Sequence, residues 1–186
     1  LFKAVLKEGK IHGMYYSGNH WKEPWTALKN ENAQLPDAYA ITYMKPGFDK
    51  FDFRFPDLDS NMVSLSDKRF RGKVTVIQIM GSWCPNCMDE TAFLSPFYEK
   101  YKQKNFQVIG LAFEKTNDFK KSVSNIIRLK NRYNIEYPIL IGGSSNKEDA
   151  SKALPMLNKI SGYPTTIILD KKGNVRKGKI IINYTG

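Results

Sequence analysis

Residues 74–90 of this 186-residue chain read VTVIQIMGSWCPNCMDE. The apolar run from Val74 to Met80 has the near-continuous pattern of a strand that is buried on both faces. A Gly-Ser pair ends that strand, and a helix is predicted from about Pro85 to Lys104. The only two cysteines of the chain, Cys84 and Cys87, therefore lie at the junction between a buried strand and the helix after it.

The position of the two thiols indicates their chemistry. Unpaired backbone N–H groups and the helix dipole favour an anion at a helix N-terminus, so Cys84 should ionise more readily than a free cysteine. Cys87 follows about one turn later on nearly the same face, where it can close a disulfide after Cys84 has attacked a partner. The pair is therefore predicted to carry out dithiol–disulfide exchange.

Three other uses of the cysteines are weighed against exchange. A structural zinc site needs four ligands, whereas the chain offers this one pair together with His12 and His20 in another segment. A purely structural disulfide across so short a loop would remove little entropy from the unfolded chain. A peroxidase that uses a single cysteine thiolate stays open as an alternative. Exchange is favoured, and no metal or organic cofactor is expected.

Strands and helices alternate through the rest of the chain. Strands are predicted at 106–113, 138–141, 165–169 and 175–182. Helices are predicted at about 117–133 and at 145–158, the second interrupted at Pro155. In the helix that carries the cysteines, Pro96 predicts a kink or a break. The side chains expected to point inward from that helix are Ala92, Phe93, Phe97, Tyr98 and Tyr101. This alternation predicts an α/β fold with helices around one sheet.

The pattern changes twice upstream of residue 74. Phe51, Phe53 and Phe55 alternate with polar residues and predict a strand hairpin with residues 62–65. Residues 2–6 and 11–16 predict a second hairpin, and a helix is expected near 22–32 with Trp25 and Leu28 on its buried side. Prolines and Gly47 then mark a boundary. Residues 1–49 are therefore predicted to be the tail of an upstream region or domain, and residues 50–186 to be the main domain.

The charge of the chain favours acidic partners without indicating a nucleic-acid site. Lys and Arg number 29 against 18 Asp and Glu, which gives a net charge of +11. The basic residues occur in scattered pairs and triplets without interleaved aromatic residues, which is typical of solvated faces. No apolar stretch approaches the ~20 residues that cross a bilayer, so no membrane span is expected. The start at Leu1 shows no signal-peptide pattern and is interpreted as a fragment boundary.

Four features occur in order across residues 51–182. They are the WCxxC of residues 83–87 after a buried strand, Glu90 three residues beyond Cys87, the stretch Gly162-Tyr163-Pro164-Thr165-Thr166 before an apolar strand, and the helix and strand at about 117–141. Together they resemble the TlpA/ResA-like family of thioredoxin-fold thiol–disulfide oxidoreductases, within the AhpC/TSA-redoxin superfamily. The resemblance implies a central mixed β-sheet flanked by helices, with an N-terminal β-hairpin and a helix–strand insertion.

The resemblance also implies roles for four residues around the cysteines. Glu90 lies beside Cys87 on the helix, where a partly buried carboxylate can accept its thiol proton; the alternative is a solvent-facing carboxylate. A cis Tyr163–Pro164 bond would let the Tyr163 backbone pair with an extended substrate segment, whereas an ordinary trans turn is the alternative. Trp83 either shields the mixed disulfide with the substrate or packs beneath it.

Two departures from the family pattern stand out. Gln78, six residues before Cys84, occupies the position where thioredoxin has a buried Asp, and it cannot titrate. Glu90 would therefore carry the proton-accepting role alone. The chain stops at Gly186, right after the last predicted strand, where the fold normally adds a helix. The final C-terminal helix is accordingly expected to be absent.

The resemblance extends to direction, partners and compartment. The neutral Asn86 after Pro85, in place of the His found in strong oxidants, favours a reductase. Family members are periplasmic or otherwise exported, receive electrons from a membrane thiol donor, and reduce disulfides in protein partners such as apocytochrome c. The lack of other cysteines agrees with an oxidising compartment. The alternative of a different class is a binding module, in which the redox fold serves as an adaptor.

Overall fold

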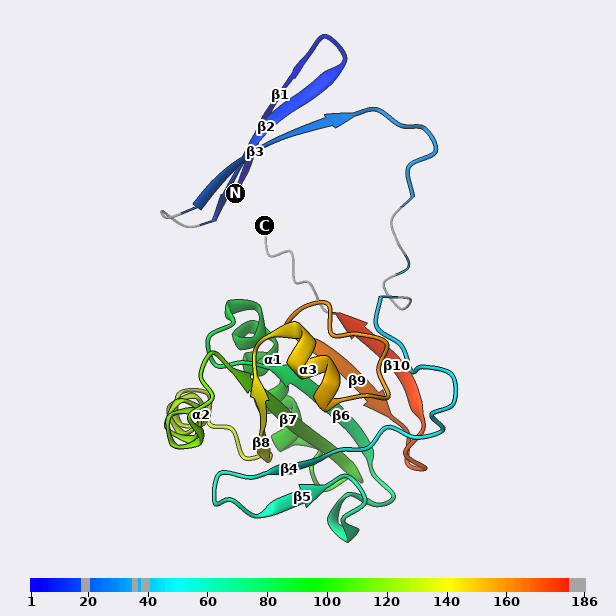
Figure 1. The fold of residues 1–186 in the computed structure, drawn as a ribbon, viewed down its shortest axis with the longest axis vertical. Coiled ribbons are helices and arrows are strands. Elements are labelled where there is room, and N and C mark those ends of the chain that lie inside the picture. The colour runs from blue at the N-terminus through cyan, green and yellow to red at the C-terminus, as the bar shows by residue number, and fades with distance from the viewer. Residues whose placement is uncertain (18–20, 35–36, 38–40, 181–186) are drawn as a thin grey trace. The chain divides into compact units, whose positions relative to one another are not determined.

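A computed structural model describes residues 1–17, 21–34, 37 and 41–180. The chain divides into two compact units, one built on residues 1–36 and the other on residues 37–183. Figure 1 shows the course of the chain through both units. Within the described ranges, no helix has the length and apolar character needed to cross a membrane.

The smaller unit is a three-stranded antiparallel sheet in the order β1-β2-β3. β1 (Phe2–Lys7) and β2 (Lys10–Ser17) form a hairpin, and β3 (Trp21–Leu28) pairs with the other side of β2. Glu8 and Gly9 connect β1 to β2 with φ values of 52° and 73°, the left-handed region that a two-residue hairpin turn requires. The predicted hairpin is therefore confirmed.

The helix expected near residues 22–32 is wrong, because most of that segment is strand β3. Trp25 lies opposite Gly13 of β2, where a Cβ atom on the glycine would come within 2.3 Å of the indole ring. The ring therefore lies directly over the β2 backbone at Gly13, where the side chain of any other residue would clash with it. Pro24 is tolerated because β3 is an outer strand of this sheet, and Leu28, expected to be buried, is 65% exposed.

The larger unit is built around a five-stranded mixed sheet, as the resemblance implied. Its strand order is β10-β9-β6-β7-β8, with parallel pairing from β6 to β8 and antiparallel pairing of β9 to β6 and of β10 to β9. The strands are β6 (Val74–Met80), β7 (Phe106–Glu114), β8 (Ile139–Ser144), β9 (Thr165–Leu169) and β10 (Val175–Ile180). The central strand β6 ends directly before the cysteines, so the sheet positions them.

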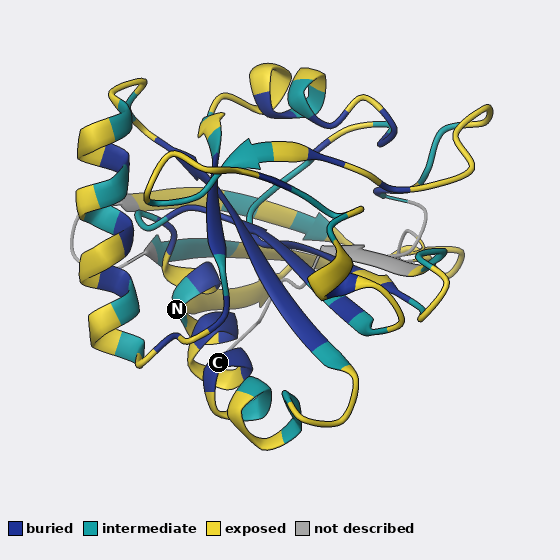
Figure 2. Cartoon of the chain, turned by 90° about the horizontal axis from the view of Figure 1, so that it is seen from below, coloured by how far each residue is buried: buried dark blue, intermediate teal, exposed yellow. Residues whose placement is uncertain are grey.

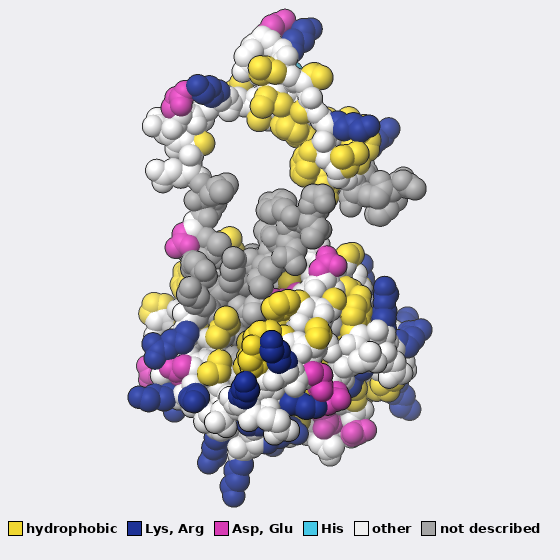
Figure 3. Space-filling view, turned by 180° about the vertical axis from the view of Figure 1, so that it is seen from behind, with side chains coloured by type: hydrophobic (Ala, Val, Ile, Leu, Met, Phe, Trp, Pro, Cys, Tyr) yellow, Lys and Arg dark blue, Asp and Glu magenta, His cyan; other side chains and the backbone are white. Residues whose placement is uncertain are grey.

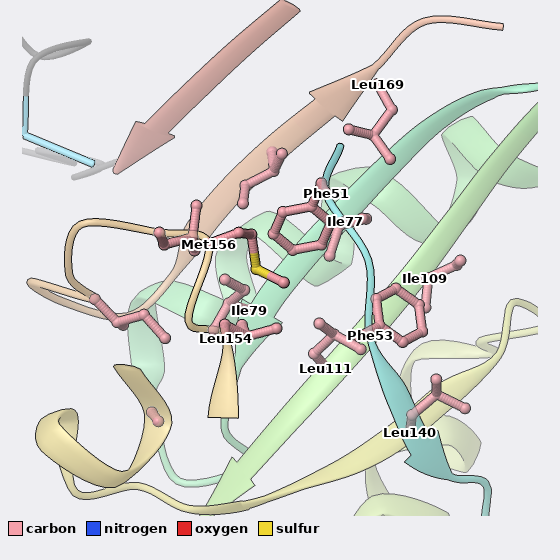
Figure 4. Packing of buried hydrophobic residues seen from close by; sticks show 14 of the residues in the cluster. Phe51, Phe53, Ile77, Ile79, Ile109, Leu111, Leu140, Leu154, Met156 and Leu169 are labelled. Carbon is pink, nitrogen blue, oxygen red and sulfur yellow. The ribbon is translucent and has the colours of Figure 1, made fainter. Parts of the chain in front are cut away.

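One face of this sheet is covered by α3 (Lys147–Ala153) and by the segment that contains β4 (Arg54–Pro56), β5 (Met62–Ser64) and a 3-10 turn (Lys68–Phe70). β4 and β5 pair as an antiparallel hairpin, which confirms the hairpin predicted there. Figure 4 shows how the buried side chains on this face meet, with Phe51 and Phe53 lying against β-strand residues such as Ile77 and Leu111.

The opposite face is covered by α1 (Pro85–Tyr101) and α2 (Phe119–Tyr133). Leu94 of α1 and Ile126 of α2 belong to one buried cluster with Met80 and Ala112 of the sheet. Figure 2 shows buried residues along the central strands, while the outer sides of the helices are exposed. Strand β6, which leads to the cysteines, is therefore covered on both faces of the sheet.

The inward face predicted for α1 is wrong at Ala92 and Phe93, whereas Tyr98 does pack against the buried cluster on this face of the sheet. Phe93 is 64% exposed and Ala92 is also exposed, whereas Cys87, Thr91 and Leu94 are buried. The helical period of 3.6 residues, counted from the buried Cys87, puts Thr91 and Leu94 on the same side and turns Phe93 outward. Pro96 lies inside the helix on its exposed side and does not break it, because water can solvate the carbonyl group that it leaves unpaired.

Residues 41–45 are attached to the larger unit. Met44 forms a β-bridge with Leu157, and the Lys45 N–H donates to the carbonyl of Met156 at 2.8 Å. The division between compact units therefore falls near residue 36, whereas the sequence placed a boundary near Gly47. That residues 1–49 are the tail of an upstream domain stays a prediction.

Strand β10 is described as far as Ile180, and its predicted end at residue 182 lies outside the described residues. Residues 181–186, and with them the predicted absence of a final helix, lie outside the described residues. On the face that carries α1, Ile168 of β9 is 36% exposed.

Basic side chains are spread over the surface of the larger unit. Figure 3 shows Lys and Arg scattered across the visible face, without gathering in one patch. In each ion pair among the described residues at least one partner is exposed, as with Arg176, which lies 2.7 Å from Asp170. Such pairs contribute little to stability because water screens them. This distribution agrees with the predicted solvated faces.

Candidate active site

The redox cysteines begin helix α1. Cys84 is the N-cap residue, with extended backbone angles, and its sulfur accepts a hydrogen bond from the Cys87 N–H at 3.2 Å. Pro85 occupies the first turn, where its missing N–H leaves no intrahelical bond unmade. One backbone N–H of this first turn, that of Cys87, therefore points toward the Cys84 sulfur.

Cys84 and Cys87 form a disulfide, with their Cα atoms 5.2 Å apart. Cys84 is 4% exposed and Cys87 is completely buried. Of the two cysteines, only Cys84 therefore retains any exposed surface.

Trp83 is fixed by its surroundings on the loop between β6 and α1. Its indole N–H donates to the carbonyl of Phe113 at 3.0 Å, and its ring meets Tyr163 edge-on at 5.4 Å between centroids. A Cβ atom on Gly81 would come within 2.3 Å of the indole nitrogen, so this glycine makes room for the ring. The ammonium group of Lys115 lies 4.8 Å above the same ring.

The Tyr163–Pro164 peptide bond is cis and leads directly into β9. The Tyr163 hydroxyl donates to the carbonyl of Ser145 at 3.2 Å, and burial raises the pKa of this hydroxyl to about 12. Tyr163 is therefore neutral at physiological pH. Its contact with Trp83 joins the proline loop to the cysteine loop.

Glu90 is buried, at 4% exposure, so it is not the solvent-facing carboxylate considered as the alternative. Its two oxygens accept from the Gln78 side-chain amide at 2.8 Å and from the Thr166 hydroxyl. Burial raises the pKa of Glu90 above its usual value, and the two hydrogen bonds act in the opposite direction. The Glu90 carboxyl group therefore holds its proton to a higher pH than an exposed glutamate does.

Gln78 connects strand β6 to helix α1. It is completely buried, and its amide nitrogen lies within hydrogen-bond distance of the Cys87 carbonyl at 3.3 Å and of the Thr91 hydroxyl at 3.2 Å, besides Glu90. Sequence reasoning noted only that Gln78 cannot titrate. It missed Thr166, although the antiparallel pairing of β6 with β9 places Thr166 directly opposite Gln78.

The chain also matches a known protein family. The family model named Redoxin matches residues 44–185. The chain belongs to the redoxin family. This redoxin is 26% identical over 132 residues to the thiol–disulfide oxidoreductase ResA of Bacillus thuringiensis subsp. konkukian, an alignment that covers 71% of this chain and 68% of the relative. The ResA of Geobacillus kaustophilus is 27% identical over 126 residues, covering 68% of this chain and 64% of the relative.

Solved structures show the same fold as this redoxin. A thiol–disulfide oxidoreductase from Bacteroides fragilis superimposes with a TM-score of 0.55 at 21% identity, covering 69% of this chain and 88% of that chain. The thioredoxin domain of a thiol–disulfide oxidoreductase from Bacteroides vulgatus gives 0.57 at 20% identity, covering 74% and 90%. The predicted thioredoxin fold and oxidoreductase family are therefore confirmed, with Cys84 and Cys87 paired as a disulfide.

Among the residues that the structure describes, no three His, Cys, Asp or Glu side chains gather as a possible metal site. His12 lies on β2 in the smaller unit, and His20 lies outside the described residues.

Glu114, at the end of β7, is a site residue that sequence reasoning missed. It is 1% exposed, and its carboxylate accepts from the Ser82 N–H and the Ser82 hydroxyl, both at 2.7 Å, and from the Asn125 side-chain amide at 3.1 Å. It therefore ties the cysteine loop of this redoxin to α2. A signal was present, since Glu114 directly follows the apolar run that ends at Phe113.

Replacing Glu114 by Ala should destabilise this redoxin by about 3 kcal/mol, because the donors of Ser82 and Asn125 would lose a buried acceptor. Urea denaturation followed by tryptophan fluorescence measures the change. Glu136→Ala, at an exposed carboxylate, is the matched control and should change stability little. Equal midpoints for both variants would show that the Glu114 hydrogen bonds do not hold the loop.

Proposed function

We propose that this redoxin reduces disulfide bonds in exported protein substrates, with Cys84 as the nucleophile. The observation that carries the proposal is the pairing of an N-cap Cys84, the more exposed thiol, with a fully buried Cys87. A Cys84 thiolate is stabilised by the Cys87 N–H and by the helix N-terminus. This arrangement supports an outward attack by one thiol and an internal attack by the other.

The proposed reaction has two exchange steps. The Cys84 thiolate attacks one sulfur of the substrate disulfide, forms a mixed disulfide and expels the other substrate sulfur as a thiolate. Cys87 then loses its proton and attacks the Cys84 sulfur, which releases the second substrate sulfur. The substrate gains two electrons, and the protein is left with the Cys84–Cys87 disulfide. A thiol donor, for which we propose a membrane reductase, must return two electrons to this disulfide.

Glu90 is proposed as the acceptor of the Cys87 proton. Cys87 is completely buried, so its proton cannot pass directly to bulk water. Glu90 lies three residues further along the same helix and is the carboxyl group whose pKa burial raises. A base of raised pKa transfers protons efficiently near neutral pH.

The substrate is proposed to lie over Trp83 and the proline loop. Trp83 and Tyr163 contact each other beside the cysteines, and Pro164 follows Tyr163 in cis. Backbone N–H and C=O groups at such a loop can pair with an extended substrate segment. Trp83 would then shield the mixed disulfide from water.

The proposed direction and compartment are supported by the sequence around the site and by the cysteine count of the chain. Asn86 adds no positive charge beside the Cys84 thiolate, which supports a reductase over a strong oxidant. The chain has no further cysteine that could mispair in an oxidising compartment, which supports export. No resident metal or organic cofactor is needed for the proposed exchange.

Residues 1–49 are proposed to belong to an upstream domain. β1 is exposed along its whole length and carries Phe2, Val5 and Leu6, each more than 60% exposed. An exposed apolar outer strand is typical of a sheet that further chain covers.

Insulin reduction with dithiothreitol as electron donor tests the proposed activity. The chain should accelerate precipitation of the insulin B chain, whereas a rate equal to dithiothreitol alone would contradict an enzyme. The reduction potential of the Cys84–Cys87 pair in defined redox buffers tests the direction. A value near or below about −270 mV supports a reductase, and one near about −120 mV would make the protein an oxidant.

A further inference from the structure

A groove lies beside the redox pair, at the junction of three elements. It has a volume of about 310 Å³ and is lined by Ser82, Met88, Asn125, Arg128, Leu129 and Arg132. Ser82 is two residues before Cys84 and Met88 begins the second turn of α1, while the remaining four residues come from α2. The volume is at the lower limit for small-molecule sites and is sufficient for one or two side chains of a bound peptide.

The groove is positively charged. Arg128 and Arg132 are four residues apart on α2, so they lie on one side of that helix. Both are exposed, and no carboxylate within salt-bridge distance of either is found among the described residues. The buried carboxylate of Glu114 is already engaged by Ser82 and Asn125. The groove therefore offers two guanidinium groups without an internal counterion.

Arg128 is held in place before any ligand arrives. The carboxylate of Glu114 can only accept, so the Asn125 amide nitrogen must face it, and this leaves the Asn125 amide oxygen for Arg128. That oxygen accepts from an Arg128 guanidinium nitrogen at 2.6 Å. A guanidinium group that is fixed through one of its N–H donors keeps its other N–H donors free for a carboxylate. Because the side chain is already positioned, less rotamer entropy is lost on binding.

We propose that this groove is a substrate subsite that binds an Asp or Glu side chain next to the target disulfide, with Arg128 and Arg132 determining the preference. The inference rests on the proposed function, since the groove adjoins the proposed nucleophile. Planar guanidinium groups bind carboxylates through paired charge-assisted hydrogen bonds. Met88 and Leu129 provide apolar walls for the methylene groups of the acidic residue. The net charge of +11 attracts acidic substrates to the protein as a whole.

Two disulfide-containing peptides that differ only in Glu or Gln beside one cysteine test the subsite. Binding is measured to the Cys84→Ser/Cys87→Ser protein, and reduction rates are measured with the reduced wild-type protein. The Glu peptide should bind and react about tenfold better at low salt. This preference should disappear in Arg128→Gln/Arg132→Gln, and it should decline with added salt.

Matched variants separate the groove from general charge. Lys120→Gln/Lys121→Gln removes the same charge from exposed positions of α2 outside the groove and should keep the preference. Arg128→Glu/Arg132→Glu should favour a Lys peptide instead. Equal binding and equal rates for the Glu and Gln peptides would overturn the subsite. A Glu preference in binding with no reduction of any peptide would support the subsite and count against the proposed function.

Discussion

Replacing Cys84 by Ser should lower catalysed insulin reduction by at least about three orders of magnitude, to the rate of dithiothreitol alone. Cys84 is the thiol that a partner can reach, and Cys87 is fully buried behind it. A serine hydroxyl stays protonated at neutral pH and cannot form a disulfide, so the first exchange step is lost. The measurement is the initial rate of insulin reduction at equal protein concentrations.

Cys87→Ser is the matched variant, because it removes the other sulfur and keeps the nucleophile. Its first exchange step should proceed, and the mixed disulfide through Cys84 should accumulate at one substrate per protein molecule. Mass spectrometry without reductant would detect this adduct, and dithiothreitol should release it. Full turnover by Cys84→Ser, or an adduct formed by Cys84→Ser and not by Cys87→Ser, would reverse the assigned roles.

Glu90→Gln should slow the second exchange step about 100-fold at neutral pH, because Gln cannot accept the Cys87 proton. The first step should be nearly unchanged, so the mixed disulfide should persist longer than in the wild-type protein. Rapid-quench alkylation during a single turnover separates the two steps. Asp89→Asn, at the exposed neighbouring position, is the control and should leave both rates unchanged.

The same variant should stabilise the protein at neutral pH. Burial raises the pKa of Glu90 above the usual 4.5 of a glutamate. At a pH between the usual pKa, which applies to the unfolded chain, and the raised pKa of folded Glu90, the folded protein binds more protons than the unfolded chain. The free energy of unfolding therefore falls as pH rises through this range. Glu90→Gln removes this pH-dependent loss of stability. The variant and the wild-type protein should therefore have the same free energy of unfolding below about pH 4.

Urea denaturation from pH 4 to pH 8 measures this pH dependence. A variant that is both slower and more stable cannot owe its slowness to poor folding. If Glu90→Gln keeps the wild-type resolving rate at every pH, another group accepts the proton. If the variant is more stable than the wild-type protein by the same amount at pH 4 and pH 8, burial of the ionised Glu90 carboxylate is not what destabilises the wild-type protein.

Local signals in the sequence were sufficient to place the redox pair. A continuous apolar run and a proline just after Cys84 fix a strand and a helix start, and the backbone geometry of a helix start then places Cys84 at the N-cap. The same kind of signal failed at residues 22–32, because Trp25 and Leu28 fit a helical stripe as well as a strand. The pairing of Trp25 with Gly13 on the neighbouring strand favours the strand over the helix, and periodicity within residues 22–32 does not report this pairing.

The hydrogen-bond partners of the site could not be predicted in this way. Glu90 and Thr166 are 76 residues apart in the chain, and their contact depends on β9 pairing with β6. Glu114 and Ser82 meet because β7 lies beside β6 in parallel. Sequence spacing reports neighbours along one helix or strand, whereas these contacts are set by the order of strands in the sheet.

The side-chain amide of Gln78 can satisfy its three neighbours at once. Its two N–H hydrogens suffice for a Glu90 oxygen and the Cys87 carbonyl, while the Thr91 hydroxyl donates to the Gln78 amide oxygen. With donors and acceptor all engaged, the amide is held in one orientation and bridges the Glu90 carboxylate to the backbone of Cys87. A change of charge on Glu90 would therefore polarise the hydrogen bond to the Cys87 carbonyl, so the first turn of α1 would sense the proton on Glu90 without any large movement of the chain.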